Sequence, residues 1–281
     1  MAFAKGHGAQ NDFIVLPDPR GRLALSDADV VGLCDRRTGI GADGVLRVVR
    51  CADDPEAVSM RAAAEWFMDY RNADGSRGAM CGKGIRVLAR YLVDTGLCRP
   101  GTQVIATRAG VRRVHVPEGR EEITVEMGEP RFPAADSRMD CAEIRTGSRS
   151  WHGLPVDMGN PHAVAFVADP TQVGDLRTPP VVGPAGIFPH GVTVEFVGIR
   201  GPGHLTVRVH ERGVGETRAC GTGACAAVAA FRRKRGAAGP ARYTVDMPGG
   251  RLHVDVDGDG RLRLGGPAVI VARGTVGVGG G

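Results

Sequence analysis

The sequence of 281 residues is poor in aromatic side chains, which make up 5% of it, and it contains no long apolar run. Without about 18 consecutive apolar residues, no membrane-spanning helix is expected. The segment Met1–Phe13 also lacks the basic-then-apolar order of a secretory signal peptide. Because few aromatic side chains are available to stack on bases, we expect neither a nucleic-acid nor a membrane partner.

The cysteine pattern fits neither a disulfide framework nor a zinc site. Seven cysteines, an odd number, are spread along the chain without a Cys-x-x-Cys pair. We therefore expect reduced thiols and a cytoplasmic location, with no zinc site. The segment Gly39–Gly44 matches the glycine pattern of dinucleotide-binding proteins, but it precedes the strand-like segment Val45–Arg50 instead of opening a helix, which argues against nucleotide binding.

The remaining composition is that of an ordinary globular protein. Hydrophobic residues make up 42% and charged residues 24% of the chain, and the formal net charge is +5. At this length two domains are expected, since a domain usually has about 100–200 residues. The densest basic run, Arg232–Arg235, is predicted to end a helix, where cations interact favourably with the helix dipole.

A short phrase occurs twice in the sequence. Cys81-Gly82-Lys83-Gly84 and Cys220-Gly221-Thr222-Gly223 are each followed by an apolar run of helical character, and about half the chain separates them. Two similar halves, each with a thiol at the start of a helix, predict one site with two facing sulfur atoms.

The predicted fold is α+β, with two pseudo-symmetric domains, each a curved, mostly antiparallel sheet around a central helix. The first domain is expected over residues 1–128, completed by 267–281, and contains Cys81. The second is expected over 129–266 and contains Cys220. Residues 178–191 are rich in proline and glycine and are predicted to form a loop. Ser26 is predicted to cap a helix that ends near Cys34. Strands are predicted at 13–16, 45–50, 65–70, 104–107, 112–116, 123–127, 156–158, 163–167, 192–199, 205–210, 243–246, 252–256, 262–264 and 269–272.

A cysteine at the start of a helix loses its proton more readily than a free cysteine. A free cysteine has a pKa of about 8.5, which the unpaired N–H groups of a helix N-terminus lower to about 3.5–7.5. Glycines beside the thiol let those N–H groups approach a carboxylate. The pattern predicts that one cysteine removes an α-proton as thiolate while the other protonates the opposite face of the carbon. The other five cysteines are predicted to be small core residues: Cys34, Cys51, Cys98, Cys141 and Cys225.

Further motifs stand in a fixed order around the two cysteines, and the whole set resembles the diaminopimelate epimerase family. The resemblance implies a cofactor-independent epimerase, with no pyridoxal phosphate and no metal, whose acid–base pair is Cys81 and Cys220 in a cleft between two domains. It implies interconversion of LL- and meso-diaminopimelate for lysine and peptidoglycan synthesis. The motifs, besides both cysteine phrases, are Lys5–Phe13, Gly39–Gly44, Asn72–Ser76, Gly159–His162, Glu211–Thr217 and Pro248–Gly250.

The same resemblance implies substrate contacts. It assigns amide contacts to three asparagines, ammonium and carboxylate contacts to Glu211 and Arg212, and a place near the reacting centre to His162. Taken alone, the asparagines lie at turns, where asparagine is common for backbone reasons, and Glu211 and Arg212 are equally compatible with a surface ion pair. The asparagines are Asn11, Asn72 and Asn160, and the expected backbone anchors of the carboxylate are Gly82, Gly221 and Thr222.

Two positions depart from the family pattern and leave the substrate open. Lys83 and Thr193 stand where the family usually has asparagine, and both are expected to touch or flank the substrate. A threonine hydroxyl cannot make both contacts of an amide, and a lysine beside Cys81 favours the thiolate. A racemase of another amino acid is therefore an alternative.

A non-catalytic amino-acid binding protein is a third reading, against which the paired cysteines argue. In each reading the partner is a small amino acid. A homodimer is compatible with the sequence, which does not specify the oligomeric state.

Overall fold

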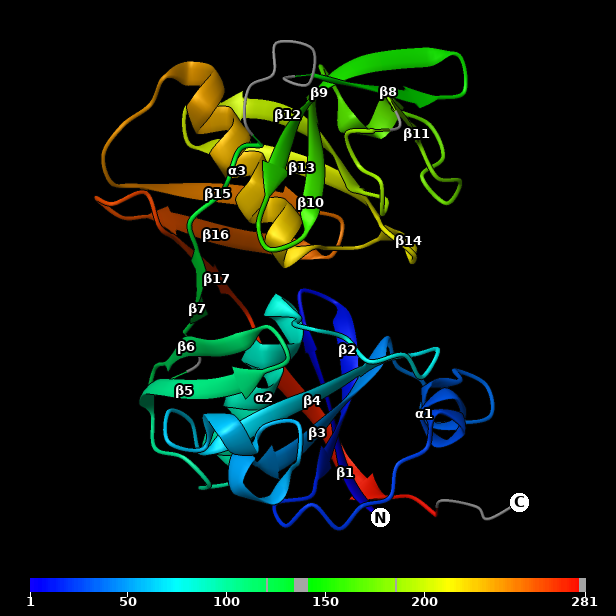
Figure 1. The fold of residues 1–281 in the computed structure, drawn as a ribbon, viewed down its shortest axis with the longest axis vertical. Helices are drawn as coiled ribbons and strands as arrows, with labels where there is room; N and C mark the ends of the chain where they lie inside the picture. The colour runs from blue at the N-terminus through cyan, green and yellow to red at the C-terminus, as the bar shows by residue number, and fades with distance from the viewer. Residues whose placement is uncertain (120, 134–140, 185, 278–281) are drawn as a thin grey trace. The chain divides into compact units, whose positions relative to one another are not determined.

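A computed structural model describes residues 1–119, 121–133, 141–184 and 186–277. The chain divides into two compact units, Met1–Val125 with Gly266–Gly281, and Glu126–Gly265. It passes into the second unit within strand β7 (Ile123–Gly128) and returns at the end of β17 (Leu262–Gly266). Each unit is a sheet packed on one long helix, so the α+β fold predicted from the sequence is confirmed (Figure 1).

The first unit is a sheet in the order β18-β1-β2-β3-β4-β5-β6-β7. Neighbouring strands are antiparallel except for the parallel pairs β2–β3 and β4–β5. Helix α2 (Gly82–Asp94) packs on β1, β2, β3, β4, β6 and β18. The other strands are β1 (Ala2–Gly8), β2 (Asn11–Pro17), β3 (Gly44–Arg50), β4 (Trp66–Asn72), β5 (Gly101–Thr107), β6 (Gly110–Val116) and β18 (Val269–Thr275).

A short helix, α1 (Asp27–Cys34), begins where the sequence predicts. The hydroxyl of Ser26 accepts the N–H of Asp29, and the Asp29 carboxylate accepts the N–H of Ser26 in return. This reciprocal pair satisfies two N–H groups that would otherwise be unpaired at the helix start. Three single turns of 3-10 helix also occur, at Cys51–Asp53, Val58–Met60 and Pro170–Gln172.

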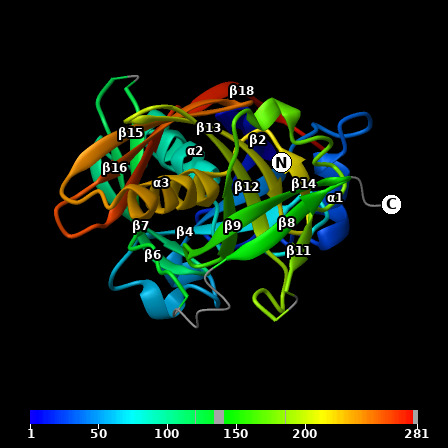
Figure 2. The same ribbon diagram turned by 90° about the horizontal axis from the view of Figure 1, so that it is seen from above.

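The second unit is a sheet in the order β11-β8-β9-β10-β12-β13-β15-β16-β17, with β14 paired to β13. Its parallel pairs are β10–β12 and β13–β15. Helix α3 (Gly221–Arg235) packs on β9, β10, β12, β13 and β16 (Figure 2). The strands are β8 (Ala142–Thr146), β9 (Arg149–Asp157), β10 (Pro161–Phe166), β11 (Val181–Gly183), β12 (Thr193–Gly201), β13 (His204–Glu211), β14 (Gly215–Thr217), β15 (Ala241–Met247) and β16 (Gly250–Val256).

The two units have the same internal order. Strands β1 to β7 of the first correspond to β9, β10, β12, β13, β15, β16 and β17 of the second, with the parallel pairs at the same places. Helix α2 follows β4 as α3 follows the β13–β14 pair. Phe13 pairs with Gly44 on the next strand as His162 pairs with Thr193, so Phe13 and His162 occupy equivalent positions. The sequence repeat is therefore a structural repeat.

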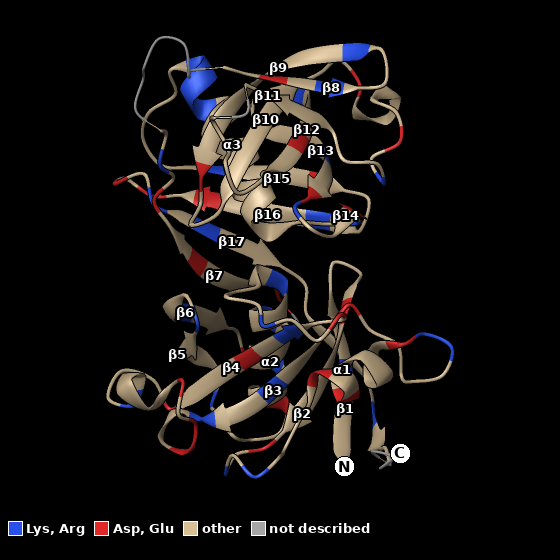
Figure 3. Cartoon of the chain, turned by 45° about the vertical axis from the view of Figure 1, so that its right-hand side comes forward, with Lys and Arg blue, Asp and Glu red and all other residues tan. Residues whose placement is uncertain are grey.

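The basic run at the end of α3 lies where the sequence predicts. All four residues of Arg232–Arg235 are in its last turn, and Gly236 ends the helix in a left-handed conformation with φ of 61°. Figure 3 shows this turn in blue at the end of an otherwise uncharged helix. The four cations interact favourably with the negative, C-terminal end of the helix dipole, and the positive, N-terminal end lies at Cys220.

The sequence prediction misses several strands. β1, β8 and β14 are absent from the predicted set, and most of β9 is missing from it. The predicted loop over residues 178–191 is wrong at β11, since Val181 and Val182 pair with Arg145 and Ile144 of β8. A strand of three residues has too little pattern to be recognised without its partner. Among the described residues no helix is long and apolar enough to cross a membrane.

Candidate active site

Cys81 lies at the N-cap of α2. Its backbone is extended, with φ −139° and ψ 113°, and its Sγ accepts the N–H of Gly84 at 3.3 Å. The thiol is half-buried. A Cβ added to Gly84 would lie 3.1 Å from Leu46 Cδ2 and 3.5 Å from Cys81 Sγ, so the first turn packs closely on β3.

Cys220 repeats this geometry at the N-cap of α3, with φ −138° and ψ 121°. Its Sγ accepts the N–H of Gly223 at 3.3 Å and lies 3.4 Å from the hydroxyl of Thr222. The N–H of Cys220 itself points to the thioether sulfur of Met247 at 3.5 Å. Both thiols therefore receive a backbone N–H at the positive end of a helix, an arrangement that favours the thiolate.

Two asparagines lie at the same end of the first sheet. Asn11 begins β2 and Asn72 ends β4, and both ends meet at Gly44, which pairs with Phe13 and with Asn72. Asn11 Nδ2 donates to Asp43 Oδ2 at 2.5 Å. Asn72 Oδ1 accepts the hydroxyl of Tyr70 at 2.6 Å, and its Nδ2 donates to Ser76 at 2.9 Å. Each amide is thus oriented by a neighbour of its own unit.

The first turns of α2 contain two buried cations. Gly82 is buried, Lys83 has only 4% of its surface exposed, and Arg86 has none. Arg86 Nη1 donates to the carbonyl of Gly82 at 3.1 Å. The equivalent first turns of α3, from Gly221 to Phe231, contain no charged residue.

Three of the predicted binding residues of the second unit are linked through β12 and β13. Thr193, at the start of β12, accepts the backbone N–H of Arg212 at 3.3 Å, so its hydroxyl holds the chain at Arg212. Arg212 is exposed and donates through Nη1 to the carbonyl of His190 at 3.1 Å. Glu211, the last residue of β13, accepts a hydrogen bond from the hydroxyl of Thr217. Asn160 precedes β10, and its carbonyl accepts the N–H of Met158 at 3.1 Å.

His162 forms a pair that the sequence does not predict. Its Nδ1 lies 2.7 Å from Glu195 Oε1, and neither side chain has any exposed surface. Burial raises the pKa of Glu195, and the nearby imidazole opposes that shift. A charged residue in the apolar strand Val192–Ile199 was the available signal, but its partner depends on the parallel register of β10 and β12.

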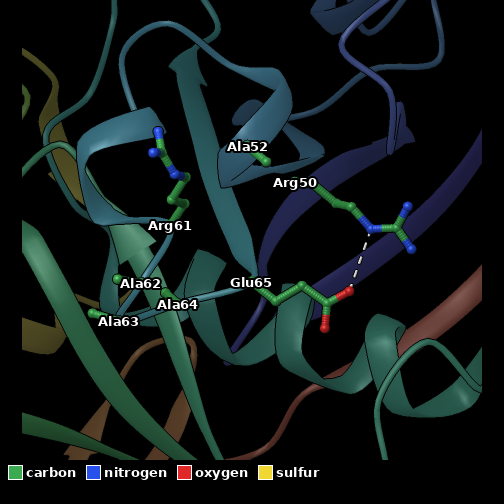
Figure 4. Close-up of a pocket in the computed structure, with 7 residues that line it drawn as sticks. All are labelled: Arg50, Ala52, Arg61, Ala62, Ala63, Ala64 and Glu65. Atoms are coloured by element: carbon green, nitrogen blue, oxygen red, sulfur yellow. Dashed lines mark hydrogen bonds and ion pairs between the residues drawn. The ribbon is translucent and has the colours of Figure 1, made fainter.

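A surface pocket in the first unit lies away from these residues. Figure 4 shows Arg50, Arg61 and Glu65 around it, with alanines between them. Arg50 and Glu65 form an ion pair at 3.3 Å. Arg50 pairs with Trp66 at the opposite end of the β3–β4 pair from Gly44 and Asn72. This pocket is therefore separate from the polar residues around Cys81, which we call the Cys81 half-site; those around Cys220 are the Cys220 half-site.

Within the described ranges, no group of three or more His, Cys, Asp and Glu side chains is arranged to hold a metal ion.

The fold is shared with solved structures whose descriptions include epimerases. A hydroxyproline epimerase from Agrobacterium vitis, solved with bound trans-4-hydroxy-L-proline, matches with a TM-score of 0.66 at 17% identity, over 98% of this chain and 90% of that one. A predicted epimerase from Pseudomonas aeruginosa matches with a TM-score of 0.68 at 16% identity, over 98% of both chains. At such low identity these structures establish the fold alone.

Sequence relatives define the chain more narrowly. The family description "Diaminopimelate epimerase" matches residues 3–133 and 155–276. The diaminopimelate epimerase of Streptomyces coelicolor is 54% identical over 279 residues, covering 98% of this chain and 94% of the relative. That of Mycobacterium tuberculosis is 44% identical over 290 residues, covering 98% and 96%. The chain belongs to the diaminopimelate epimerase family.

Proposed function

We propose that this protein interconverts LL- and meso-diaminopimelate by a two-cysteine acid–base mechanism that uses no cofactor. The observation that supports it most strongly is the duplicated geometry of Cys81 and Cys220, each a helix N-cap whose sulfur receives a backbone N–H. Relatives with 44–54% identity over nearly the full chain carry the name of this activity.

The chemistry follows from the helix starts. A carboxylate is bound well by the free N–H groups of a helix N-terminus, and the same groups stabilise negative charge as the α-proton leaves. One sulfur, as thiolate, takes the α-proton, and the other, as thiol, gives its proton to the opposite face of the carbon. The substrate keeps its composition and inverts its configuration, while the two sulfur atoms exchange protonation states.

The binding residues then have distinct tasks. Glu211 and Arg212 are suited to the ammonium and carboxylate groups of an amino acid, because a guanidinium can hold a carboxylate with two hydrogen bonds. Thr193 holds the backbone of Arg212, so we assign it a positioning role. Asn11, Asn72 and Asn160 supply further amide contacts, and His162 lies near the Cys220 half-site.

The departures at Lys83 and Thr193 leave the proposed reaction intact. Lys83 is buried on the first turn of α2. Thr193 acts on Arg212 through its hydroxyl. Neither change removes a group that the thiol chemistry needs, and the sequence relatives favour diaminopimelate over another amino acid. Free thiols also require a reducing compartment, so we place the enzyme in the cytoplasm.

A solvent-exchange experiment tests this function. The purified protein is incubated under reducing conditions in deuterium oxide with LL-diaminopimelate, and separately with lysine, glutamate and proline. Mass spectrometry measures α-deuterium, and chiral chromatography measures inversion. We expect exchange and inversion with diaminopimelate. Exchange only with another amino acid would reassign the substrate, and exchange with none would contradict the proposed chemistry.

A further inference from the structure

The two half-sites differ directly behind their cysteines. In the first unit the side chain against the first helical turn is Leu46, whose Cδ2 lies 3.1 Å from the Cβ position of Gly84. In the second unit the equivalent side chain is Glu195, whose Oε1 lies 2.6 Å from the Cβ position of Gly223. Leu46 and Glu195 are equivalent by strand register, since Val15 pairs with the first and Val164 with the second. Where the first unit has an apolar side chain against the turn that follows Cys81, the second unit has a carboxyl group against the turn that follows Cys220.

The neighbouring position differs in the same way. Phe13 beside Leu46 corresponds to His162 beside Glu195. His162 Nε2 and Glu195 Oε2 are buried without a hydrogen-bond partner among the described residues, and such groups cost about 1–3 kcal/mol each. Phe13 and Leu46 show that this fold accepts an apolar pair at that place. The fold therefore does not need the polar pair of His162 and Glu195 for its stability, and we attribute the pair to a role at Cys220.

The position of Glu195 Oε1 determines whether Glu195 favours the thiol or the thiolate form of Cys220. This one oxygen faces both His162 Nδ1 and the turn at Gly223, whose N–H reaches Cys220 Sγ. Whether the shared proton lies on nitrogen or on oxygen, the oxygen bears negative partial charge. The carboxyl oxygen therefore disfavours a negative charge on Cys220 Sγ, whereas the helix N-terminus favours that charge. Leu46 exerts no such effect on Cys81.

The cation nearest to Cys220 in sequence, Arg218, is exposed and donates to the carbonyl of Pro248, so solvent screens its charge more than that of the buried Glu195. Glu211 on β13 adds negative charge near Glu195, and β15 brings the thioether of Met247 to the N–H of Cys220. On β16 the buried face is apolar, and on β9 Asp157 is paired with Arg131. Before its last turn, α3 itself contributes no charged side chain and one further thiol, Cys225. The first turns of α2, by contrast, bring the buried cations Lys83 and Arg86 to the Cys81 half-site.

We propose that Glu195 is a positioning residue that keeps the proton on Cys220, so that the substrate-free enzyme holds a thiolate at Cys81 and a thiol at Cys220. The inference rests on the proposed function for its meaning in catalysis. The resting enzyme is then set to deprotonate the epimer whose α-hydrogen faces Cys81. After that turnover the proton must pass from Cys81 back to Cys220 before the same reaction is repeated.

Alkylation of each thiol tests the proposal without any turnover. Iodoacetamide reacts with thiolates, and peptide mass analysis gives the rate at Cys220 and at Cys81 separately as a function of pH. In the wild type we expect the pH midpoint of Cys220 to lie above that of Cys81. In Glu195→Leu we expect the Cys220 midpoint to fall by about half a pH unit or more, and in Glu195→Gln by less. Cys81 in the same sample is the internal reference.

Two controls protect the experiment against misfolding. Glu195→Gln keeps the shape of the side chain, and the double variant Glu195→Leu with His162→Phe copies the Phe13–Leu46 pair that the first unit already contains. Leu46→Met conserves volume at the equivalent position and is expected to move neither midpoint. The proposal is overturned if the Cys220 midpoint stays or rises in folded variants, if both midpoints move together, or if Cys81 has the higher midpoint in the wild type. Because no substrate is used, this result is independent of the exchange experiment on diaminopimelate.

Discussion

Thr217 donates its hydroxyl hydrogen to the carboxylate of Glu211, and the same hydroxyl lies 3.1 Å from the carbonyl of Ala219. Ala219 directly precedes Cys220, so one threonine connects a carboxylate proposed to bind the substrate with the start of α3. Glu211 is held at the end of β13 by β14, whose Gly215 pairs with it. The orientation of Glu211 therefore depends on a residue outside its own strand.

Removing this hydroxyl is predicted to weaken substrate binding. Thr217→Val keeps the shape of the side chain but removes the hydroxyl that donates to Glu211. We expect KM to rise about tenfold with a smaller change in kcat, since a hydrogen bond to a charged group contributes about 1.5–3 kcal/mol. Thr217→Ser retains the hydroxyl and is expected to restore KM. Equal KM values for the valine and serine variants would contradict the role of the hydroxyl.

The two cysteines are predicted to be individually indispensable. Cys81→Ala and Cys220→Ala each remove one proton carrier, and we expect epimerisation to fall by a factor of about 10²–10⁴ or more. Chiral chromatography of the product checks this. Cys34→Ala, which changes a buried thiol of the first core, is the matched control and is expected to keep its turnover. Turnover at the wild-type rate by either alanine variant would refute the acid–base pair.

A buried ion cluster in the first unit is predicted to stabilise the fold. The Asp69 carboxylate, 1% exposed, accepts hydrogen bonds from Arg47 at 3.0 Å and Arg108 at 2.5 Å. Asp69→Asn removes the carboxylate that these guanidinium groups share, while Arg47 keeps its pairs with Asp18 and Asp54. We expect unfolding to become easier by about 1.5–3 kcal/mol, the contribution of a hydrogen bond to a charged group. Urea unfolding measures the loss.

Asp27→Asn is the matched control for this cluster. Asp27 also pairs with an arginine, Arg71, at 3.1 Å, but its side chain is 74% exposed. An exposed pair contributes about 0–1 kcal/mol, so a small effect is expected. A loss from Asp69→Asn as small as that from Asp27→Asn would show that the cluster does not stabilise the unit.

Acid is predicted to weaken the second unit through Asp246. Hydrogen bonding from Arg251, with a further contribution from His204, lowers the pKa of Asp246 to about 2. In the unfolded chain an aspartate titrates near a pKa of about 3.9. Because the folded pKa is the lower one, its stabilisation is complete above about pH 4 and is lost as the pH falls towards 2. The carboxylate is partly exposed, so the effect is small.

Asp246→Asn tests this acid sensitivity. The variant is expected to be less stable than the wild type at pH 7 and to lose less stability between pH 4 and pH 2, as measured by urea unfolding at each pH. Asp259→Asn changes an exposed carboxylate in the turn before β17 and is the control. Parallel stability curves for the wild type and Asp246→Asn across this range would contradict the assignment.

How far the sequence predicts this molecule depends on how local each feature is. The helix starts at Cys81 and Cys220 are predictable, because the glycines and the apolar run that define them lie within a few residues. The pairing of His162 with Glu195 is not, because it requires the parallel register of β10 with β12 and the position of Gly223 above them.

The missed strands have the same physical origin. β1 contains Gly6 and Gly8 between polar residues, and it is a strand because β2 and β18 pair with both of its edges. β18 itself comes from the far end of the chain. Alternation within seven residues cannot reveal partners so distant in sequence.

The discontinuity of the first unit has a consequence for biosynthesis. Its strand β18 follows the whole second unit in the chain, so β1 acquires its second neighbour only after Glu126–Gly265 has been translated. The intervening unit, Glu126–Gly265, is a single uninterrupted stretch and can fold on the nascent chain before that. A ribosome stalled shortly before β18 would thus display one finished lobe and one with an open sheet edge, the form most exposed to chaperones and proteases.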